Sequence, residues 1–192
     1  LSSIGGDELG GYLATRHLID LGHGRIGIVA GPRYASSSRG RLAGHRRALE
    51  EAGIAFVAER VEESTFGIDA GAEAAERLLR RAPDLTAIFV VNDNIAVGVL
   101  STLTRLGRSV PEDVSLVGYN DIPLVSRLPI PMTTVRVPFD QIATAALDLL
   151  NAGARSDQDR IRVAAPTLIP RRSTAPVAAD PTRPDPSRAD PA

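Results

Sequence analysis

The sequence predicts an α/β fold, in which helices flank a largely parallel sheet. Helical and strand patterns alternate along the chain with short connections, and this alternation is typical of right-handed β–α–β units. A compact apolar run, residues 87–91, is followed by the polar triplet Asn92, Asp93 and Asn94, after which apolar residues recur at helical spacing. This stretch therefore predicts a buried strand that leads directly into a helix.

The predicted elements follow one another along most of the chain. In order, they are a helix over 8–21, a strand near 25–30, a helix at 40–53, a strand near 55–61, a helix at 68–82, a strand at 86–91, a helix at 94–107, a strand at 114–118, a strand near 133–137, a helix at 139–152 and a strand near 161–169. Gly53 and Gly107 support two of the helix ends, because glycine readily adopts the left-handed conformation that ends many helices.

The end of the chain has a different composition. Residues 174–192 contain five prolines, balanced charge and no aromatic, Leu or Ile residue. A segment of this kind cannot bury enough apolar surface to offset the entropy of ordering it. We therefore predict a folded domain over residues 1–173, followed by a disordered proline-rich tail.

The overall composition excludes several classes of protein. The chain carries 22 basic and 23 acidic side chains, a formal net charge of -1, so no whole-chain field attracts nucleic acid or an anionic membrane. It contains no cysteine, which excludes disulfides and suits a reducing cytosol. No apolar run approaches the roughly 20 residues needed to span a bilayer, and the start shows no signal-peptide pattern. We expect a cytoplasmic protein with its own hydrophobic core.

Polar or aromatic side chains follow four of the predicted strands. They are Asn92, Asp93 and Asn94, Asn120 and Asp121, Phe66, and the polar segment 33–41. Ligands of open parallel sheets bind at the carboxyl ends of the strands, so these side chains are candidate ligand contacts. Two simpler interpretations stay open. Asp93 is a favoured residue type for the N-cap of the next helix, and Asn120 suits a turn.

Several longer stretches resemble the landmarks of one known family. They are "HLIDLGHGRIGIVAGP", "SRGRLAGHRRALEEAGI", "TAIFVVNDNIAVGVLSTLTRLGRSVPEDVSLVGYNDI", "PMTTVRVPFDQIATAALDLL" and the closing "LIPRRST". In order and spacing these stretches are similar to the lactose/galactose-repressor (LacI/GalR) family, over roughly residues 4–174.

The resemblance implies a periplasmic-binding-protein-like sensor with two α/β lobes and an effector bound between them. By that comparison, residues 25–135 and 160–173 look like the carboxy-terminal lobe, and residues 1–22 and 138–153 look like remnants of an amino-terminal lobe whose start is missing. Family members are usually homodimers that bind operator DNA through an amino-terminal helix-turn-helix headpiece. The resemblance thus implies that operator contacts belong to a headpiece absent from these residues.

Individual residues match effector-contacting positions of the family. Arg41 in "SRGRLAG" matches its effector-binding arginine, whose planar guanidinium can donate to two neighbouring oxygens. Phe66 matches the aromatic ring that lies against the effector, and Asn92 matches an amide that both donates and accepts hydrogen bonds. Phe139 in "VPFDQ" falls on a pocket position of some members, with a plain packing role as an equal alternative.

One position departs from the family pattern. The family often has two aspartates where this chain has Asn120 and Asp121, so a neutral amide replaces the effector-contacting carboxylate. Charge-assisted hydrogen bonds are roughly twice as strong as neutral ones, so this contact is weakened and Arg41 loses a nearby anion. We expect a sugar or sugar-derivative effector, and an anionic group on that effector would find Arg41 available.

Other motifs do not support an enzyme. Gly22, Gly24 and Gly27 form GxGxxG, but they precede a strand instead of joining a strand to a helix, as dinucleotide sites require. The three histidines have no partner at metal-ligand or catalytic spacing. We therefore expect no enzyme activity, no cofactor and no metal. The leading hypothesis is the ligand-sensing domain of a transcriptional regulator, and the alternative is a periplasmic sugar-binding protein of an ABC-type transporter.

Overall fold

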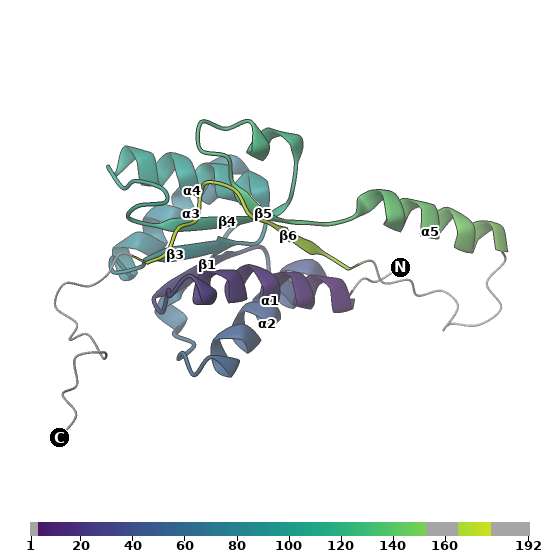
Figure 1. The fold of residues 1–192 in the computed structure, drawn as a ribbon, viewed down its shortest axis with the longest axis horizontal. Helices are drawn as coiled ribbons and strands as arrows, with labels where there is room; N and C mark the ends of the chain where they lie inside the picture. Colours follow the sequence, from purple (N-terminus) through teal and green to yellow (C-terminus); the bar gives the residue numbers. More distant parts are fainter. Residues whose placement is uncertain (1–3, 153–164, 178–192) are drawn as a thin grey trace, which may run out of the picture.

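The structure is a computed structural model that describes residues 4–152 and 165–177. These residues form a sheet in the order β2-β1-β3-β4-β5-β6, with helices on both faces (Figure 1). Strands β1 to β5 are parallel, and β6 runs antiparallel to β5. The elements are α1 (Ile4–Asp20), β1 (Ile26–Ala30), α2 (Ser36–Glu51), η1 (Ala58–Arg60), β2 (Val61–Glu63), α3 (Ile68–Arg81), β3 (Ala87–Val90), α4 (Asp93–Arg105), β4 (Ser115–Asn120), η2 (Pro123–Ser126), β5 (Thr133–Arg136), α5 (Phe139–Ala152) and β6 (Thr167–Ile169). The predicted α/β fold is confirmed.

The largest difference in an element boundary is at β2. The sequence predicts this strand near residues 55–61, whereas the structure has the short helix η1 followed by β2 at Val61–Glu63. Two apolar residues in this region, Ile54 and Phe56, pack against the core from a loop. These two side chains are apolar because the loop that carries them packs against the core, so they do not mark the position of the strand.

Two helix pairs enclose the sheet. Helices α1 and α2 lie on one face, and α3 and α4 lie on the other (Figure 1). A Cβ on Gly11 would overlap the backbone carbonyl of Arg41, and a Cβ on Gly44 would overlap backbone atoms of α1. On the opposite face, Gly71 and Gly98 allow α3 and α4 the same close approach. Glycines thus set the spacing of both helix pairs.

Helix α1 belongs to the same body as the sheet. Its residues Ala14 and Leu18 are fully buried in the core, and α1 packs along α2. The described part of residues 1–22 thus covers one face of the sheet, and its assignment to a remnant of another lobe stays a prediction. Helix α5 extends away from the sheet (Figure 1). The assignment of residues 138–153 to the other lobe stays a prediction.

The chain after β6 is docked against the sheet. Ser173 Oγ accepts a hydrogen bond from the Thr133 backbone at 2.8 Å, and the Ala175 carbonyl lies 3.0 Å from His23 Nε2. The Val177 backbone donates to the Leu21 carbonyl at 2.9 Å. Residues 174–177, which the sequence assigned to the start of the disordered tail, are therefore held against the folded part by backbone and side-chain hydrogen bonds. Residues 178–192, like 161–164 of the predicted last strand, lie outside the described residues.

His45 lies in the core between α2 and the sheet. Its Nδ1 is 2.9 Å from Thr15 Oγ1, and that hydroxyl also lies 2.9 Å from the Gly11 carbonyl. Because the single hydroxyl proton of Thr15 goes to the carbonyl, Nδ1 must carry the hydrogen that His45 donates. The ring is packed near Phe56 and Phe89. Burial lowers the pKa of His45 to about 3, so the ring is neutral.

Acidification from about pH 6.5 to about pH 5 is expected to lower the free energy of unfolding more steeply in the unmodified chain than in a His45→Gln variant. The imidazole titrates near 6.5 when unfolded and near 3 when folded, so the unfolded state binds one more proton between these values. This contribution is fully present above about pH 6.5 and is lost at up to about 1.4 kcal/mol per pH unit below it. Urea denaturation across this range measures both slopes, and equal slopes would contradict the assignment.

Candidate functional site

Arg41 reaches from α2 to the carboxyl ends of the central strands. Its Nη1 donates to the Val91 carbonyl at 2.6 Å, directly after β3. The guanidinium lies 3.8 Å from the centroid of the Tyr119 ring on β4, a cation–π contact. Its Nε donates to Asp7 Oδ1 at 3.0 Å. The structure thus places the predicted ligand arginine at the predicted edge of the sheet.

Asp7 and Tyr119 are part of this site, although sequence reasoning missed both. Tyr119 is almost fully buried, and burial raises its pKa to about 12, which keeps the ring neutral beside the guanidinium. Asp7 precedes Gly11, Ala14 and Leu18, which face α2 and the sheet, at helical spacing. That spacing was a usable signal that Asp7 lies on the inward side of α1.

Asn92 is the N-cap of α4. Its side-chain oxygen accepts a hydrogen bond from the Asn94 backbone at 2.8 Å, and the residue has extended backbone geometry. The prediction that Asp93 caps this helix is therefore wrong. Both residue types cap helices well, and the choice between them depends on what surrounds Asp93. The half-buried Asn92 keeps its amide hydrogens available for other partners.

Asp93 is fully buried and joins three elements. Its carboxylate accepts a hydrogen bond from the Ile122 backbone at 2.9 Å and one from Thr134 Oγ1 at 2.8 Å. Burial raises its pKa, and these hydrogen bonds act in the opposite direction. A Cβ on Gly118 would overlap the same carboxylate, so the glycine makes room for it. Asp93 thereby ties the start of α4 to β5 and to the loop after β4.

Asn120, the last residue of β4, and Asp121, the residue after it, have an unusual backbone conformation. Both have positive φ values, 112° and 58°, which non-glycine residues rarely adopt and which often mark functional edges. The Asp121 carboxylate accepts from Arg136 at 2.7 Å and from Arg171 at 2.6 Å, and only 7% of its side chain is exposed. Its carboxylate therefore joins β5 to the segment after β6, and a ligand contact at Asp121 stays a prediction. Asn120 stays a candidate contact.

The two predicted aromatic contacts lie in different settings. Phe66 is half buried beside Gly31, at the carboxyl end of β1, where a Cβ on the glycine would lie 2.6 Å from the ring. Phe139 begins α5 and is 57% exposed. No described contact joins Phe139 to Arg41 or Asn92. The structure therefore brings Arg41, Asn92 and Asn120 to one edge, with Phe66 on an adjacent strand end and Phe139 apart.

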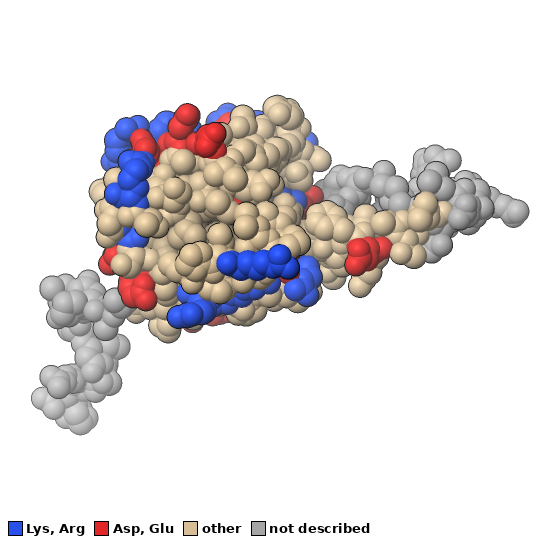
Figure 2. Space-filling model, turned by 90° about the horizontal axis from the view of Figure 1, so that it is seen from above, with Lys and Arg blue, Asp and Glu red and all other residues tan. Residues whose placement is uncertain are grey.

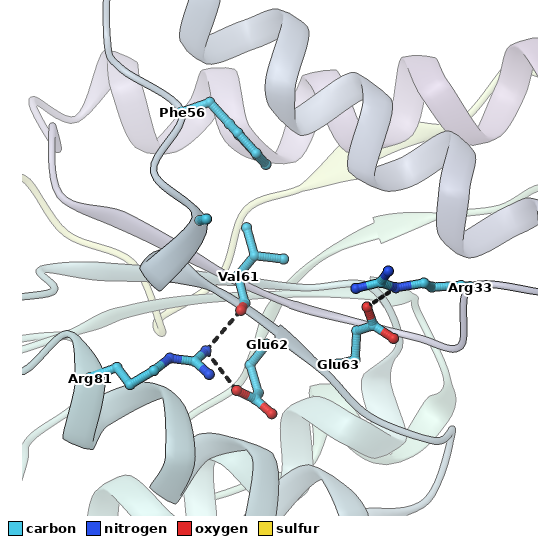
Figure 3. Close-up of a pocket in the computed structure, with 7 residues that line it drawn as sticks. Arg33, Phe56, Val61, Glu62, Glu63 and Arg81 are labelled. Carbon is cyan, nitrogen blue, oxygen red and sulfur yellow. Dashed lines mark hydrogen bonds and ion pairs between the residues drawn. The ribbon is translucent and has the colours of Figure 1, made fainter.

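Two open pockets lie on the β2 side of the sheet. One, of about 370 Å³, is shown in Figure 3 and is lined by Arg33, Phe56, Val61, Glu62, Glu63 and Arg81. Arg81 pairs with Glu62 at 2.6 Å, and Arg33 pairs with Glu63. The other pocket, of about 460 Å³, also includes Arg33. Neither contains Arg41, Asn92 or Asn120, so the predicted contacts form an open edge outside both pockets.

The part of the chain that the structure describes contains neither a metal-binding cluster nor a membrane-spanning helix. Among residues 4–152 and 165–177, no three His, Asp or Glu side chains are grouped so that they could hold a metal ion. Within the same ranges, no helix has both the length and the apolar character needed to cross a membrane.

Comparisons with known proteins agree with this architecture. Residues 15–174 match the model of the periplasmic binding protein-like domain family. The ribose operon repressor of Haemophilus influenzae is 36% identical over 167 residues, which cover 86% of this chain and 50% of that protein. The chain thus spans about half the length of the curated relatives that it matches.

Solved structures of transcriptional regulators also resemble this chain. A complex of the transcriptional regulator CelR with cellobiose has a TM-score of 0.80 and 34% identity, covering 88% of this chain and 52% of that one. A LacI family transcriptional regulator from Enterococcus faecium with bound ribose has a TM-score of 0.79 and 29% identity, covering 90% and 65%. These relatives are regulators and not enzymes, in agreement with the sequence prediction. The chain therefore belongs to the periplasmic binding protein-like domain family, and within it the chain is similar to LacI family transcriptional regulators.

Proposed function

We propose that this chain senses a sugar-like effector for a bacterial transcriptional regulator and, through that effector, alters operator DNA binding. The observation that carries the proposal is the placement of Arg41 across Tyr119, beside Asn92, at the carboxyl ends of β3 and β4. Similar regulators have been solved with cellobiose and with ribose. The proposed effector class, a sugar, rests on the placement of these side chains together with the sugars bound in the two similar regulators.

The side chains at this edge suit a polyhydroxylated ring. A guanidinium donates in a fixed fork to neighbouring hydroxyl oxygens, and the Asn92 amide hydrogens donate beside it. Asn120 offers an amide that both donates and accepts. Phe66, on the neighbouring strand end, supplies an aromatic surface for the apolar face of a sugar ring.

Asp121 supports a route by which ligand binding would reach the rest of the protein. It follows Asn120 directly, and its carboxylate binds Arg136 at the end of β5 and Arg171 after β6. Strand β5 leads into α5, which leaves the sheet at this edge (Figure 1). A ligand that shifts the turn at Asn120 would therefore shift both connecting strands. Such coupling is typically worth about 1–3 kcal/mol between sites.

The partners of the whole protein follow from the same proposal. Operator DNA would be bound by a segment other than the described residues, since the chain's net charge is -1. Helix α4 carries no charged residue between Asp93 and Arg105 and lies under a broad uncharged surface (Figure 2), which supports a homodimer through this face. A protein that binds operator DNA acts in the cytoplasm. No observation favours a periplasmic transport protein over this assignment.

An Asn92→Asp variant is expected to bind its sugar at least about tenfold more weakly than the unmodified chain, because a ligand oxygen that accepts from the amide would be left without a donor. Aspartate keeps the N-cap acceptor of α4 but removes the amide hydrogens, so the helix start is retained while a ligand donor is lost. The matched control is Asn94→Asp, the same change at an exposed position of α4. Titration of each protein with ribose and with cellobiose, followed by NMR at the Arg41 Nε–H, measures the affinities.

The controls separate the two halves of the proposal. Equal sugar affinity in the Asn92 and Asn94 variants would exclude Asn92 as a contact, and no shift at Arg41 with either sugar or with a wider sugar panel would exclude this edge. In a protein that joins this chain to its DNA-binding segment, the same sugar should change operator affinity by roughly 5–150-fold in a gel-shift assay. Sugar binding without such a change would contradict the regulator assignment.

A further inference from the structure

The sheet edge at which Arg41, Asn92 and Asn120 gather, here called the ligand edge, contains a carboxylate that opposes the charge of Arg41. Asp7 on α1 lies 3.0 Å from Arg41 Nε and 2.9 Å from Arg41 Nη2, across 34 positions of sequence. Only 10% of the Arg41 side chain and 14% of the Asp7 side chain are exposed. Water screens such a pair far less than it screens a surface pair, so the two charges largely cancel where a ligand would meet them.

The guanidinium is also held in place by neutral groups. Nη1 donates to the Val91 carbonyl at 2.6 Å, and the ring of Tyr119 supports one face. Together with the hydrogen bond from Nε and the ion pair from Nη2 to Asp7, these contacts fix the plane of the guanidinium. Arg41 therefore presents a rigid set of donors with little net positive charge.

The ion pair between Asp7 and Arg41 changes the ligand charge that the sequence led us to expect. The amide at Asn120 removes a carboxylate from the strand end, and sequence reasoning left Arg41 open to an anionic ligand for that reason. In the structure a carboxylate from α1 is paired with the same guanidinium. An anion approaching Arg41 would meet attraction from the guanidinium and repulsion from Asp7 at similar distances. A neutral hydroxyl group would meet no such repulsion.

We propose that Asp7 is a specificity-determining residue, which makes this edge accept uncharged polyhydroxyl ligands and reject ligands that carry a phosphate or carboxylate at Arg41. This inference rests on the proposed ligand edge and deepens it by naming the ligand class. The specific juxtaposition is the Asp7 carboxylate against Arg41 Nε and Nη2. Asp7 acts by setting the charge at the site and by orienting the arginine.

The test measures anion binding at Arg41 before and after the charge of Asp7 is removed. Asp7→Asn keeps an oxygen that can accept from Arg41 Nε, so the geometry is retained while the negative charge is lost. The probe is inorganic phosphate, titrated to about 20 mM and followed by NMR at the Arg41 Nε–H. The matched control is Asp20→Asn, which removes the same charge at the opposite, exposed end of α1.

The expected result is that phosphate leaves the Arg41 signal unchanged in the unmodified chain and in the Asp20 variant. Asp7→Asn should bind phosphate at least about tenfold more tightly than either, as expected when one opposing charge is removed from a partly buried site. In Asp7→Glu, which restores the charge, phosphate should again leave the Arg41 signal unchanged. If Asp7→Asn fails to fold by circular dichroism, Asp7→Ser carries the same comparison.

Two outcomes would overturn the inference. One is phosphate binding at Arg41 in the unmodified chain with a dissociation constant below about 1 mM, and the other is an equal response of the Asp7 and Asp20 variants. Neither outcome depends on a sugar being found. A chain that binds no sugar but gains phosphate binding in Asp7→Asn would keep this inference and count against the proposed function alone.

Discussion

A Gly44→Ala variant is expected to lose roughly 3 kcal/mol of unfolding free energy, although alanine is the better helix former by about 1 kcal/mol. A Cβ at this position would overlap the Glu8 carbonyl and lie 2.6 Å from the Tyr12 nitrogen. These are backbone atoms of α1, which cannot rotate away as a flexible side chain can. Helices α1 and α2 would have to separate along their whole contact, which opens the core beneath them.

The matched control for this prediction is Gly24→Ala. Gly24 lies in the turn between α1 and β1, and a Cβ there would meet nothing within 4 Å. We expect this variant to stay within about 0.5 kcal/mol of the unmodified chain. Urea denaturation followed by circular dichroism compares the three proteins. If Gly44→Ala is as stable as Gly24→Ala, α1 and α2 do not pack as closely as the structure has them.

An Asp93→Ala variant is expected to lose about 3 kcal/mol or more of unfolding free energy. The change leaves the Ile122 N–H and the Thr134 hydroxyl without their acceptor in a buried place, at about 1–3 kcal/mol for each unsatisfied group. It also disconnects the start of α4 from β5 and from the loop after β4. Asp93→Asn, which keeps one acceptor oxygen, should lose less.

The control for Asp93 is Asp69→Ala, an exposed acidic residue in the first turn of α3. It shares the favourable interaction of a carboxylate with a helix N-terminus but lacks the buried contacts, so a loss below about 1 kcal/mol is expected. Hydrogen exchange should show reduced protection of the Ile122 amide in Asp93→Ala alone. Equal losses in the two alanine variants would mean that Asp93 acts only as a first-turn carboxylate.

Local pattern was sufficient to predict β3 and α4. The run Ala87–Val90 is apolar because it crosses the centre of the sheet, and the polar residues after it mark the end of the strand. Local pattern was insufficient to assign the cap of α4, because Asn92 and Asp93 are both good capping residues. Asp93 is drawn inward by partners 29 and 41 positions away, which leaves the cap to Asn92.

The candidate site was predicted in part for the same reason. Arg41, Asn92 and Asn120 were placed at one edge of the sheet, because each follows or faces a strand end and parallel strands end together. The ion pairs of Asp121 were not predicted, because its two arginine partners come from β5 and from the chain after β6. Asp7 was missed because its contact with Arg41 joins two helices that the sequence does not orient relative to each other.

The sequence by itself determined the alternation of strands and helices, the parallel sheet, the family and the edge at which polar residues gather. These features follow from periodicity and from side chains a few positions apart, and the chain fixes such spacings directly. Only the tertiary structure decided which polar groups at that edge are already engaged. Asp7, Asp93 and Asp121 are all committed to partners distant in sequence, and those pairings exist only after the sheet and its helices have packed.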